Sequence, residues 1–207
     1  MSSSWKGCSL DFAGSRAVPG AAADSGMSSV KIVVGGGFGS GKTTFVGSVS
    51  EITPLTTEAV MTSASAGVDD LSHTPDKTST TVAMDFGRVT LDEGLILYLF
   101  GTPGQHRFWF MWDDLIRGAI GAVVLVDTRR LADSFAAVDY FESAKLPFIV
   151  AVNGFGGDFP HEIADVQNAL SVSPHVPVIQ CDARQRSSTK HALTTLVEHA
   201  MAIQLRV

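Results

Sequence analysis

The chain has 207 residues, of which 45% are hydrophobic and only 17% are charged, and its formal net charge is −6. This composition suits one folded domain, while the acidic balance argues against a nucleic-acid-binding protein and against binding to an anionic membrane through charge. The longest apolar stretch, 118–126, is far shorter than the roughly 20 residues that cross a bilayer, so no membrane span is expected. Cys8 and Cys181 are too far apart in sequence to suggest a disulfide framework or a metal cluster, and we expect a reduced, cytoplasmic protein.

The order of apolar runs predicts two regions. Residues 1–29 are rich in glycine, serine and alanine without an apolar period, which predicts a flexible tail. From residue 30 to residue 207, short apolar runs alternate with longer mixed stretches, which predicts one α/β domain with a mostly parallel six-stranded sheet. The predicted strands are 30–34, 82–91, 95–100, 121–126, 147–152 and 176–179. The predicted helices are 41–50, 108–118, 131–144, 160–170 and 188–205.

The second predicted strand differs from the others, because its apolar residues alternate. Val82, Met84 and Phe86 share one face, and the phase shifts after Gly87, which predicts a bulge there. The turn at 92–94 leads directly into the next apolar run, as in a hairpin. We therefore predict one antiparallel strand at the edge of the sheet.

A stretch between these elements, residues 53–81, has 12 serines and threonines among its 29 residues and no convincing period. A loop of this length in a compact domain is usually disordered or functional. Its composition alone leaves open whether it is a tolerated insertion or a functional loop.

Residues 36–43 read GGFGSGKT and match G-x-x-x-x-G-K-[ST], the phosphate-binding P-loop, between a predicted strand and a predicted helix. The glycines let backbone N–H groups turn toward a phosphate, and the helix N-terminus adds partial positive charge. The lysine of this motif reaches the β- and γ-phosphates, and the hydroxyl of its last residue ligates Mg²⁺. The candidate nucleotide-binding residues of the motif and its flank are Gly36, Gly37, Phe38, Gly39, Ser40, Gly41, Lys42, Thr43 and Thr44.

The runs TVAMDFG (81–87) and LFGTPGQ (99–105) carry a family resemblance. With the P-loop, they make residues 30–205 resemble the small Ras-like GTPases. More narrowly, the chain looks like the bacterial branch that contains the gliding-polarity GTPase and the GTPases of actinobacterial conservon operons. The resemblance implies a three-layer Ras-like P-loop fold that binds GTP or GDP with Mg²⁺.

The resemblance also implies residue roles around the γ-phosphate. Thr81 matches the switch threonine that closes on Mg²⁺ and the γ-phosphate, and the 53–81 stretch then becomes the switch loop. Gly104 matches the glycine whose N–H contacts the γ-phosphate, and Gln105 matches the glutamine that orients the attacking water. The candidate catalytic residues are Lys42, Thr81 and Gln105, and the candidate metal ligands are Thr43 and Thr81.

The motif that recognises the nucleotide base is only partly present. Asn153 matches the first residue of the Asn-Lys-x-Asp motif, but Gly154 replaces its lysine and Gly156 its aspartate, with Asp158 two residues further on. The run 182–184 resembles the loop that backs the guanine base, which adds Asp182, Ala183 and Arg184 to the candidate nucleotide-binding residues. Because a site that hydrogen-bonds guanine rejects adenine through unpaired polar groups, guanine is favoured and adenine stays open.

Two further departures concern the metal and the rate. Where the family has its Mg²⁺-site aspartate, this chain has Gly101. Asp127, at the end of a predicted strand, either provides the Mg²⁺-site carboxylate instead or orders the following turn. Phe38 stands where a small P-loop residue usually faces the γ-phosphate, which predicts slow hydrolysis. Four arginines are possible phosphate ligands, but an exposed surface position is the simpler interpretation for each: Arg88, Arg107, Arg129 and Arg130.

Five consecutive large apolar residues, 108–112, fall in a predicted helix. One buried helix face cannot cover all five, so Trp109 and Phe110 are candidates for a partner-binding surface unless a loop or the tail covers them. By resemblance, the partners would be a roadblock-type regulator and a sensor-kinase-like membrane protein, which could recruit the protein to the membrane.

Three functions remain open from the sequence. The first is a GTP-binding switch with weak GTPase activity. The second is an ATP-using phosphotransferase or ATPase with Asp127 at the metal, and the third is a nucleotide-binding module without turnover.

Overall fold

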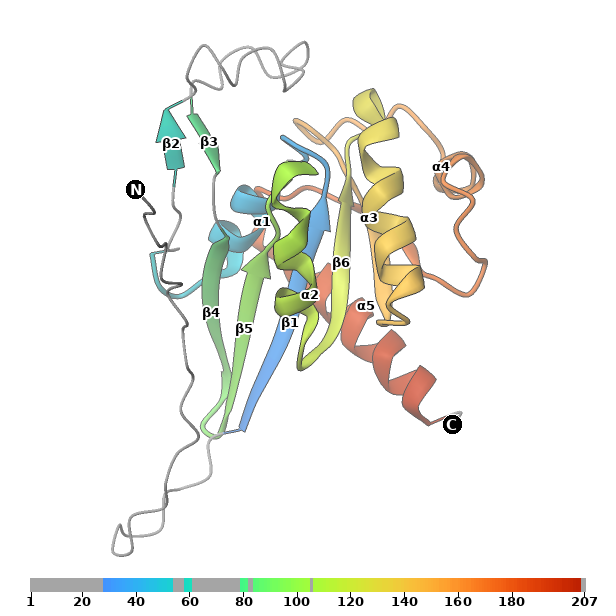
Figure 1. The fold of residues 1–207 in the computed structure, drawn as a ribbon. Helices are drawn as coiled ribbons and strands as arrows, with labels where there is room; N and C mark the ends of the chain where they lie inside the picture. Colours follow the sequence, from blue (N-terminus) through green and yellow to red (C-terminus); the bar gives the residue numbers. More distant parts are fainter. Residues whose placement is uncertain (1–27, 54–57, 61–78, 82–83, 105, 206–207) are drawn as a thin grey trace, which may run out of the picture.

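The computed structural model describes residues 28–53, 58–60, 79–81, 84–104 and 106–205. Six strands form the main sheet of this part: β1 (Ser28–Gly36), β4 (Asp85–Asp92), β5 (Leu95–Gly101), β6 (Ala119–Val126), β7 (Phe148–Asn153) and β8 (Val178–Cys181). Their order is β4-β5-β1-β6-β7-β8, and only β4 runs antiparallel to its neighbour (Figure 1). This confirms the predicted α/β fold with one antiparallel edge strand.

Helices cover both faces of the sheet and make three layers. They are α1 (Lys42–Val49), α2 (Trp112–Ile116), α3 (Ala132–Ser143), α4 (Ile163–Ala169) and α5 (Arg186–Gln204), with 3-10 turns η1 (His106–Met111) and η2 (Thr128–Arg130). Helices α1 and α5 pack on one face, and α2, α3 and α4 contribute to the core on the other.

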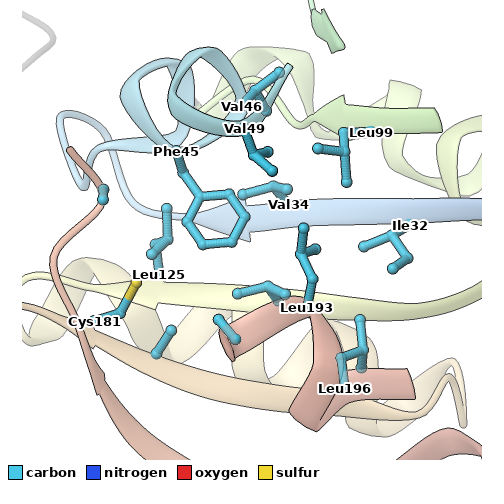
Figure 2. Close-up of a cluster of buried hydrophobic side chains, with 14 of the residues drawn as sticks. Ile32, Val34, Phe45, Val46, Val49, Leu99, Leu125, Cys181, Leu193 and Leu196 are labelled. Atoms are coloured by element: carbon cyan, nitrogen blue, oxygen red, sulfur yellow. The ribbon is translucent and has the colours of Figure 1, made fainter. Parts of the chain in front are cut away.

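Alternating strand side chains supply the two cores. On β1, Ile32 and Val34 belong to the cluster under α1 and α5 (Figure 2), whereas Val33 belongs to the cluster under α2 and α3. The same alternation recurs on β6 and β7, whose residues are buried nearly throughout. Strands covered on both faces read as continuous apolar runs, which is why they were predictable from sequence.

The antiparallel strand at the edge of the sheet corrects the place of one feature. The register of β4 against β5 is unbroken from Asp85 to Thr90 and shifts between Thr90 and Asp92, so the shift lies further along the strand than the bulge predicted directly after Gly87. Phe86 is only partly buried. Its ring stacks on Tyr98 at 5.6 Å between centroids, while Asp85 and the next alternate residues face the α1 side.

Other boundaries differ as well. The predicted helix over 108–118 begins as the 3-10 turn η1 and is helical only from residue 112 to residue 116. Two short strands, β2 (Glu58–Val60) and β3 (Ser79–Thr81), pair antiparallel within the 53–81 stretch, where no element was predicted. Strand β1 begins two residues before the predicted domain start, and residues 1–27 of the predicted tail lie outside the described residues.

The sheet has two distinct ends. The carboxyl ends of its parallel strands carry the P-loop and the loops after β5, β6, β7 and β8, the usual place for a ligand in such folds. At the opposite end, the backbone N–H of Ser28 donates to the carbonyl of Gly94 at the tip of the β4–β5 hairpin, at 2.7 Å. Helix α5 also ends there, at the lower end of Figure 1.

Candidate functional site

The P-loop leaves β1 and enters α1 through backbone conformations that only glycine adopts easily. Gly36 has a φ of +135°, and a Cβ there would lie 2.3 Å from the carbonyl oxygen of Leu125. Gly41, which caps α1, has a φ of +104°. Side chains at these positions would force the loop out of its path, so these two glycines fix the shape of the loop.

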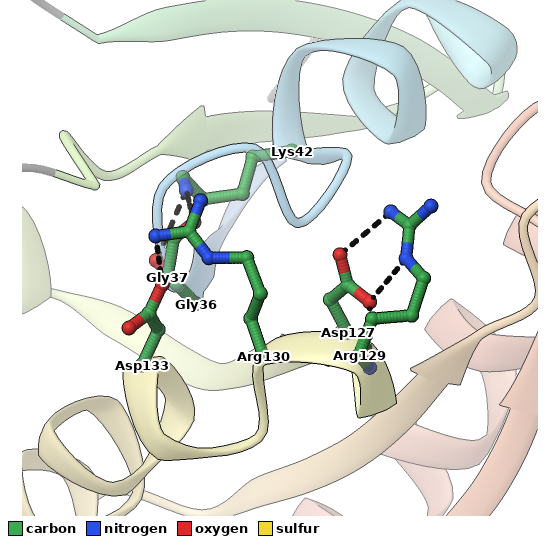
Figure 3. A network of polar contacts seen from close by, with 7 residues as sticks. All are labelled: Gly36, Gly37, Lys42, Asp127, Arg129, Arg130 and Asp133. Atoms are coloured by element: carbon green, nitrogen blue, oxygen red, sulfur yellow. Dashed lines mark hydrogen bonds and ion pairs between the residues drawn. The ribbon is translucent and has the colours of Figure 1, made fainter. Parts of the chain in front are cut away.

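The Lys42 ammonium lies within this loop. It donates to the carbonyl of Gly36 at 3.0 Å and to that of Gly37 at 2.6 Å, and the residue is 8% exposed (Figure 3). These two hydrogen bonds hold the ammonium inside the loop. The loop therefore concentrates positive charge where a phosphate would bind.

The loop that follows β5 lies against the P-loop. A Cβ on Gly104 would be 2.9 Å from Nζ of Lys42 and 2.9 Å from Cα of Phe38, so Gly104 approaches both residues through its backbone. The indole N–H of Trp112 donates to the carbonyl of Pro103 at 3.3 Å and helps to hold this segment. Phe38 itself is half-buried, and Gln105, the next predicted residue, lies outside the described residues.

Thr43 has a partner that was not among the predicted site residues. Its hydroxyl donates to Oδ2 of Asp85 at 2.8 Å, and Asp85 is only 2% exposed. A hydroxyl and a carboxylate are oxygen ligands of the kind that Mg²⁺ prefers, so these residues fit a magnesium site. The other predicted ligand, Thr81, ends β3, and its side chain lies outside the described residues.

A sequence signal for Asp85 exists in hindsight. It is the one charged residue of the run TVAMDFG, and the hairpin sets it directly opposite Gly101. In the alternating pattern of Val82, Met84 and Phe86, Asp85 falls on the opposite face of the strand from these apolar residues.

Asn153 joins three segments at the other end of the P-loop. Its amide N–H donates to the carbonyl of Ser40 at 2.9 Å, and its amide oxygen accepts from the backbone N–H of Ala183 at 3.1 Å. The side chain lies so close to the start of α1 that a Cβ on Gly41 would be 2.6 Å from Nδ2. It thus links the P-loop, the end of β7 and the loop after β8.

The loop after β8 is stabilised by its own charges. The Asp182 carboxylate accepts from Nε of Arg184 at 3.1 Å and from Nη2 at 3.0 Å. It also accepts from Gln185 Nε2 at 3.2 Å. The hydrogen bond from the Arg184 side chain is the main cause that lowers the pKa of Asp182 to about 2. Asp182 is therefore ionised and engaged within its own loop.

The structure explains why a glycine stands at the lysine position of the base motif. A Cβ on Gly154 would lie 2.4 Å from the Phe159 ring, which occupies the space that a longer side chain would need. Thus Phe159, rather than a lysine stem, borders this side of the site.

Two cavities lie next to Asn153. The smaller, about 70 Å³, is lined by Gly41, Thr44, Asn153, Gly154, Phe155, Asp182, Ala183 and Arg184. The larger, about 240 Å³, is lined by Thr128, Arg129, Asn153, Phe155, Asp158 and Pro160. The structure therefore brings the predicted base-side residues around one small cavity and adds Phe155 and Asp158 beside it.

Asp127 orders a turn, one of the two interpretations left open by the sequence. Its Oδ1 accepts from the backbone N–H and Nε of Arg129, and its Oδ2 from Nη2 at 2.7 Å (Figure 3). The Arg129 guanidinium also lies 3.8 Å from the ring centroid of Phe155. In the same turn, Arg130 pairs with Asp133 at 2.6 Å.

The two candidate partner-binding residues differ in exposure. Phe110 is 75% exposed. Trp109 is half-buried and packs on Trp112, with 5.5 Å between ring centroids. Phe110 is therefore exposed, as expected for a candidate partner-binding residue, whereas Trp109 is only partly exposed.

The described residues contain no group of three or more histidines, cysteines, aspartates and glutamates that could hold a metal ion. No helix among them is long and apolar enough to cross a membrane. Cys181 is a buried free thiol, and burial raises its pKa.

Comparison with known sequences shows the family of the chain. A family model described as a conserved hypothetical ATP binding protein matches residues 34–203. An uncharacterized protein of Methanocaldococcus jannaschii, MJ1339, is 33% identical over 75 residues. That match covers 35% of this chain and 48% of the relative, so the chain spans about half of that protein's length.

Two solved structures are similar over nearly their whole length. One is the small GTPase Arl6 (BBS3) of Trypanosoma brucei, solved with the nucleotide analogue GppNp, at a TM-score of 0.60 and 15% identity. The other is the G domain of the T. maritima iron transporter FeoB, at a TM-score of 0.55 and 16% identity. Each match covers 84% of this chain and 99% of the other chain, which confirms the Ras-like P-loop fold.

Proposed function

The chain belongs to the family of conserved hypothetical ATP binding proteins, and from this premise and its P-loop GTPase fold we propose that it is a GTP-binding molecular switch with slow GTP hydrolysis. The observation that carries the proposal is the contact of Gly104 with Lys42 and Phe38. It puts the segment that leads to Gln105 beside the phosphate end of the P-loop. A switch needs this proximity, because its moving segment must respond to the γ-phosphate.

Guanine is the base that we propose. Its N1 and N2 groups both donate hydrogen bonds, and a carboxylate accepts from both. Asp158 lines the same cavity as Asn153 and can provide that carboxylate in place of the missing aspartate at position 156. Adenine is the alternative, favoured by the description of the family, and would suit an ATPase or a phosphotransferase.

Calorimetry with GDP, GTP, ADP and ATP, each with Mg²⁺, tests the choice of base. We expect guanine nucleotides to bind at least about tenfold more tightly, which is the lower end of the value of one hydrogen bond to a charged group. Asp158→Asn should reduce that preference, while Asp139→Asn, an exposed carboxylate on α3, should leave it unchanged. Binding of ATP alone would overturn the GTP-switch proposal and favour the alternative.

We propose that turnover is slow because of Phe38. In the Ras-like GTPases that the chain resembles, a small residue stands at this P-loop position and faces the γ-phosphate. We propose that Lys42, Thr81 and Gln105 carry hydrolysis and that Thr43 and Thr81 hold Mg²⁺. Single-turnover measurements should show GTP loss over minutes or longer, and Gln105→Leu should slow it further. If GTP binds but neither the wild type nor the variant hydrolyses it, the chain is a binding module without turnover.

We also propose that Phe110 belongs to a partner surface, together with its sequence neighbour Trp109, which is only partly exposed. A roadblock-type regulator is the expected partner, and a sensor-kinase-like membrane protein could recruit the complex from the cytoplasm to a membrane. Titrating such a regulator against the GDP-bound and GTP-bound protein tests this, with Phe110→Ser as the variant. Equal binding by wild type and variant in both nucleotide states would exclude this surface.

A further inference from the structure

The magnesium site of a P-loop protein combines the hydroxyl of the P-loop with a carboxylate from a nearby strand. Two positions could provide that carboxylate by sequence. Gly101 has no side chain, and Asp127 engages both of its oxygens with Arg129. Neither position gives Thr43 a carboxylate partner.

Asp85 is in contact with Thr43. Its Oδ2 accepts from the Thr43 hydroxyl at 2.8 Å, and the residue is 2% exposed. Burial matters, because a carboxylate in a low-dielectric surrounding attracts a nearby cation far more strongly than an exposed one does. The carboxylate comes from β4, the antiparallel edge strand, rather than from β5.

Asp85 and Gly101 are also coupled sterically. They face each other across the β4–β5 ladder. A Cβ on Gly101 would lie 2.9 Å from Oδ2 and 3.0 Å from Cβ of Asp85. The first distance is shorter than real Cβ contacts and the second is tighter than most, so a side chain at position 101 would crowd the Asp85 carboxylate, and the glycine leaves this space to Asp85.

We propose that Asp85 provides the carboxylate of the magnesium site, in place of the aspartate that the related GTPases carry at the position of Gly101. The Thr43 hydroxyl donates its proton to Asp85 and keeps its oxygen lone pairs directed elsewhere, toward a cation. Asp85 acts as a positioning residue for Thr43 and adds negative charge beside the ion. This inference rests on the proposed nucleotide binding and deepens it.

Release of the fluorescent nucleotide mant-GDP, measured against Mg²⁺ concentration, tests the assignment; mant-ADP replaces it if adenine binds more tightly. In Asp85→Asn, the Mg²⁺ concentration that halves the release rate should rise about 10- to 100-fold, the usual loss when a partner of a metal ligand is changed. Release in EDTA should stay at the wild-type rate, because no metal is then bound. Electron paramagnetic resonance of Mn²⁺ gives a second readout, with less bound Mn²⁺ expected for the variant.

Asp127→Asn is the matched control, since Asp127 is also buried, at 4% exposed, and directly follows β6 at the carboxyl end of the same sheet. It should leave the Mg²⁺ dependence unchanged. The exchange Asp85→Gly with Gly101→Asp moves the carboxylate across the ladder and should recover most of the lost Mg²⁺ affinity.

The outcomes separate the two proposals. An unchanged Mg²⁺ dependence in Asp85→Asn, or a shift in Asp127→Asn instead, overturns the role of Asp85 and leaves nucleotide binding intact. If neither mant-GDP nor mant-ADP binds even in EDTA, the proposed function fails, and the role of Asp85 fails with it.

Discussion

At the scale of single residues, the site is shaped as much by small residues as by reactive ones. Gly101 leaves room for the Asp85 carboxylate, and Gly154 leaves room for the Phe159 ring. In both cases a side chain from another segment lies in the space that a side chain at the glycine position would need. The missing motif residues are therefore linked to specific neighbours.

Restoring a lysine at position 154 tests this link. Gly154→Lys should lower the free energy of unfolding by about 1–3 kcal/mol, because the new side chain meets the Phe159 ring. Phe159→Ala should remove the conflict, so that the double variant is less destabilised than the sum of the single variants by roughly 1 kcal/mol. Urea unfolding of the four proteins measures this coupling, and strictly additive effects would show that the ring does not restrict position 154.

Which site residues were predictable depends on how local their signal is. The P-loop residues form one continuous motif between a strand and a helix, so spacing alone identified them. Asp85 gains its meaning from the register of two strands and from a contact with Thr43, 42 positions away in sequence. The placement of Phe159 over Gly154 likewise depends on the path of a loop, which no local pattern specifies.

At the scale of elements, the strands were predicted better than the turns. Strands β1, β6 and β7 are apolar on both faces because helices cover both, and that leaves an unmistakable run in the sequence. The three-residue strands β2 and β3 bring too few residues to show a period. The apolar content of residues 108–112 predicted an α-helix, but residues 106–111 form the 3-10 turn η1. The Trp112 indole that follows it donates a hydrogen bond to the carbonyl of Pro103.

Asn153 is the residue that ties elements together at the site. Asn153→Ala removes its bonds to Ser40 and Ala183 and leaves a buried carbonyl and a buried N–H without this partner. We expect a loss of about 2–4 kcal/mol in the free energy of unfolding, together with weaker nucleotide binding. Denaturant unfolding and calorimetry measure the two effects.

Asn168→Ala, at an exposed position on α4, is the control and should change stability by less than about 0.5 kcal/mol. If Asn153→Ala were as mild as this control, the three segments would not depend on one side chain.

At the scale of the whole molecule, the charges at the carboxyl end of the sheet affect the pH dependence of stability. The pKa of Asp182 is lowered to about 2 from an ordinary value of 3.8, chiefly by the hydrogen bond from Arg184. A lowered pKa means that the folded state favours the ionised carboxylate. The stabilisation is therefore complete above about pH 4 and is lost as the pH falls toward 2.

Asp182→Asn tests this sign. At pH 7 the variant should be less stable than the wild type by about 1 kcal/mol, a modest value because solvent weakens the pair with the exposed Arg184. The difference should shrink below pH 4 and be mostly lost as the pH falls through about 2, as urea unfolding at several pH values would show. A difference that stays constant from pH 7 to pH 2.5 would mean that the amide disturbs packing rather than charge.

The direction of the chain through the sheet has a mechanical consequence. β1 begins beside the tip of the β4–β5 hairpin and runs up to the P-loop, and α5 runs back to end at the same pole. A tether attached to the start of β1 or to the end of α5 would hold the folded unit at the end of the sheet opposite the P-loop, and the P-loop would face away from the anchor. A force that pulls on both of these ends would act first on β1 and α5 at that opposite end, far from the P-loop.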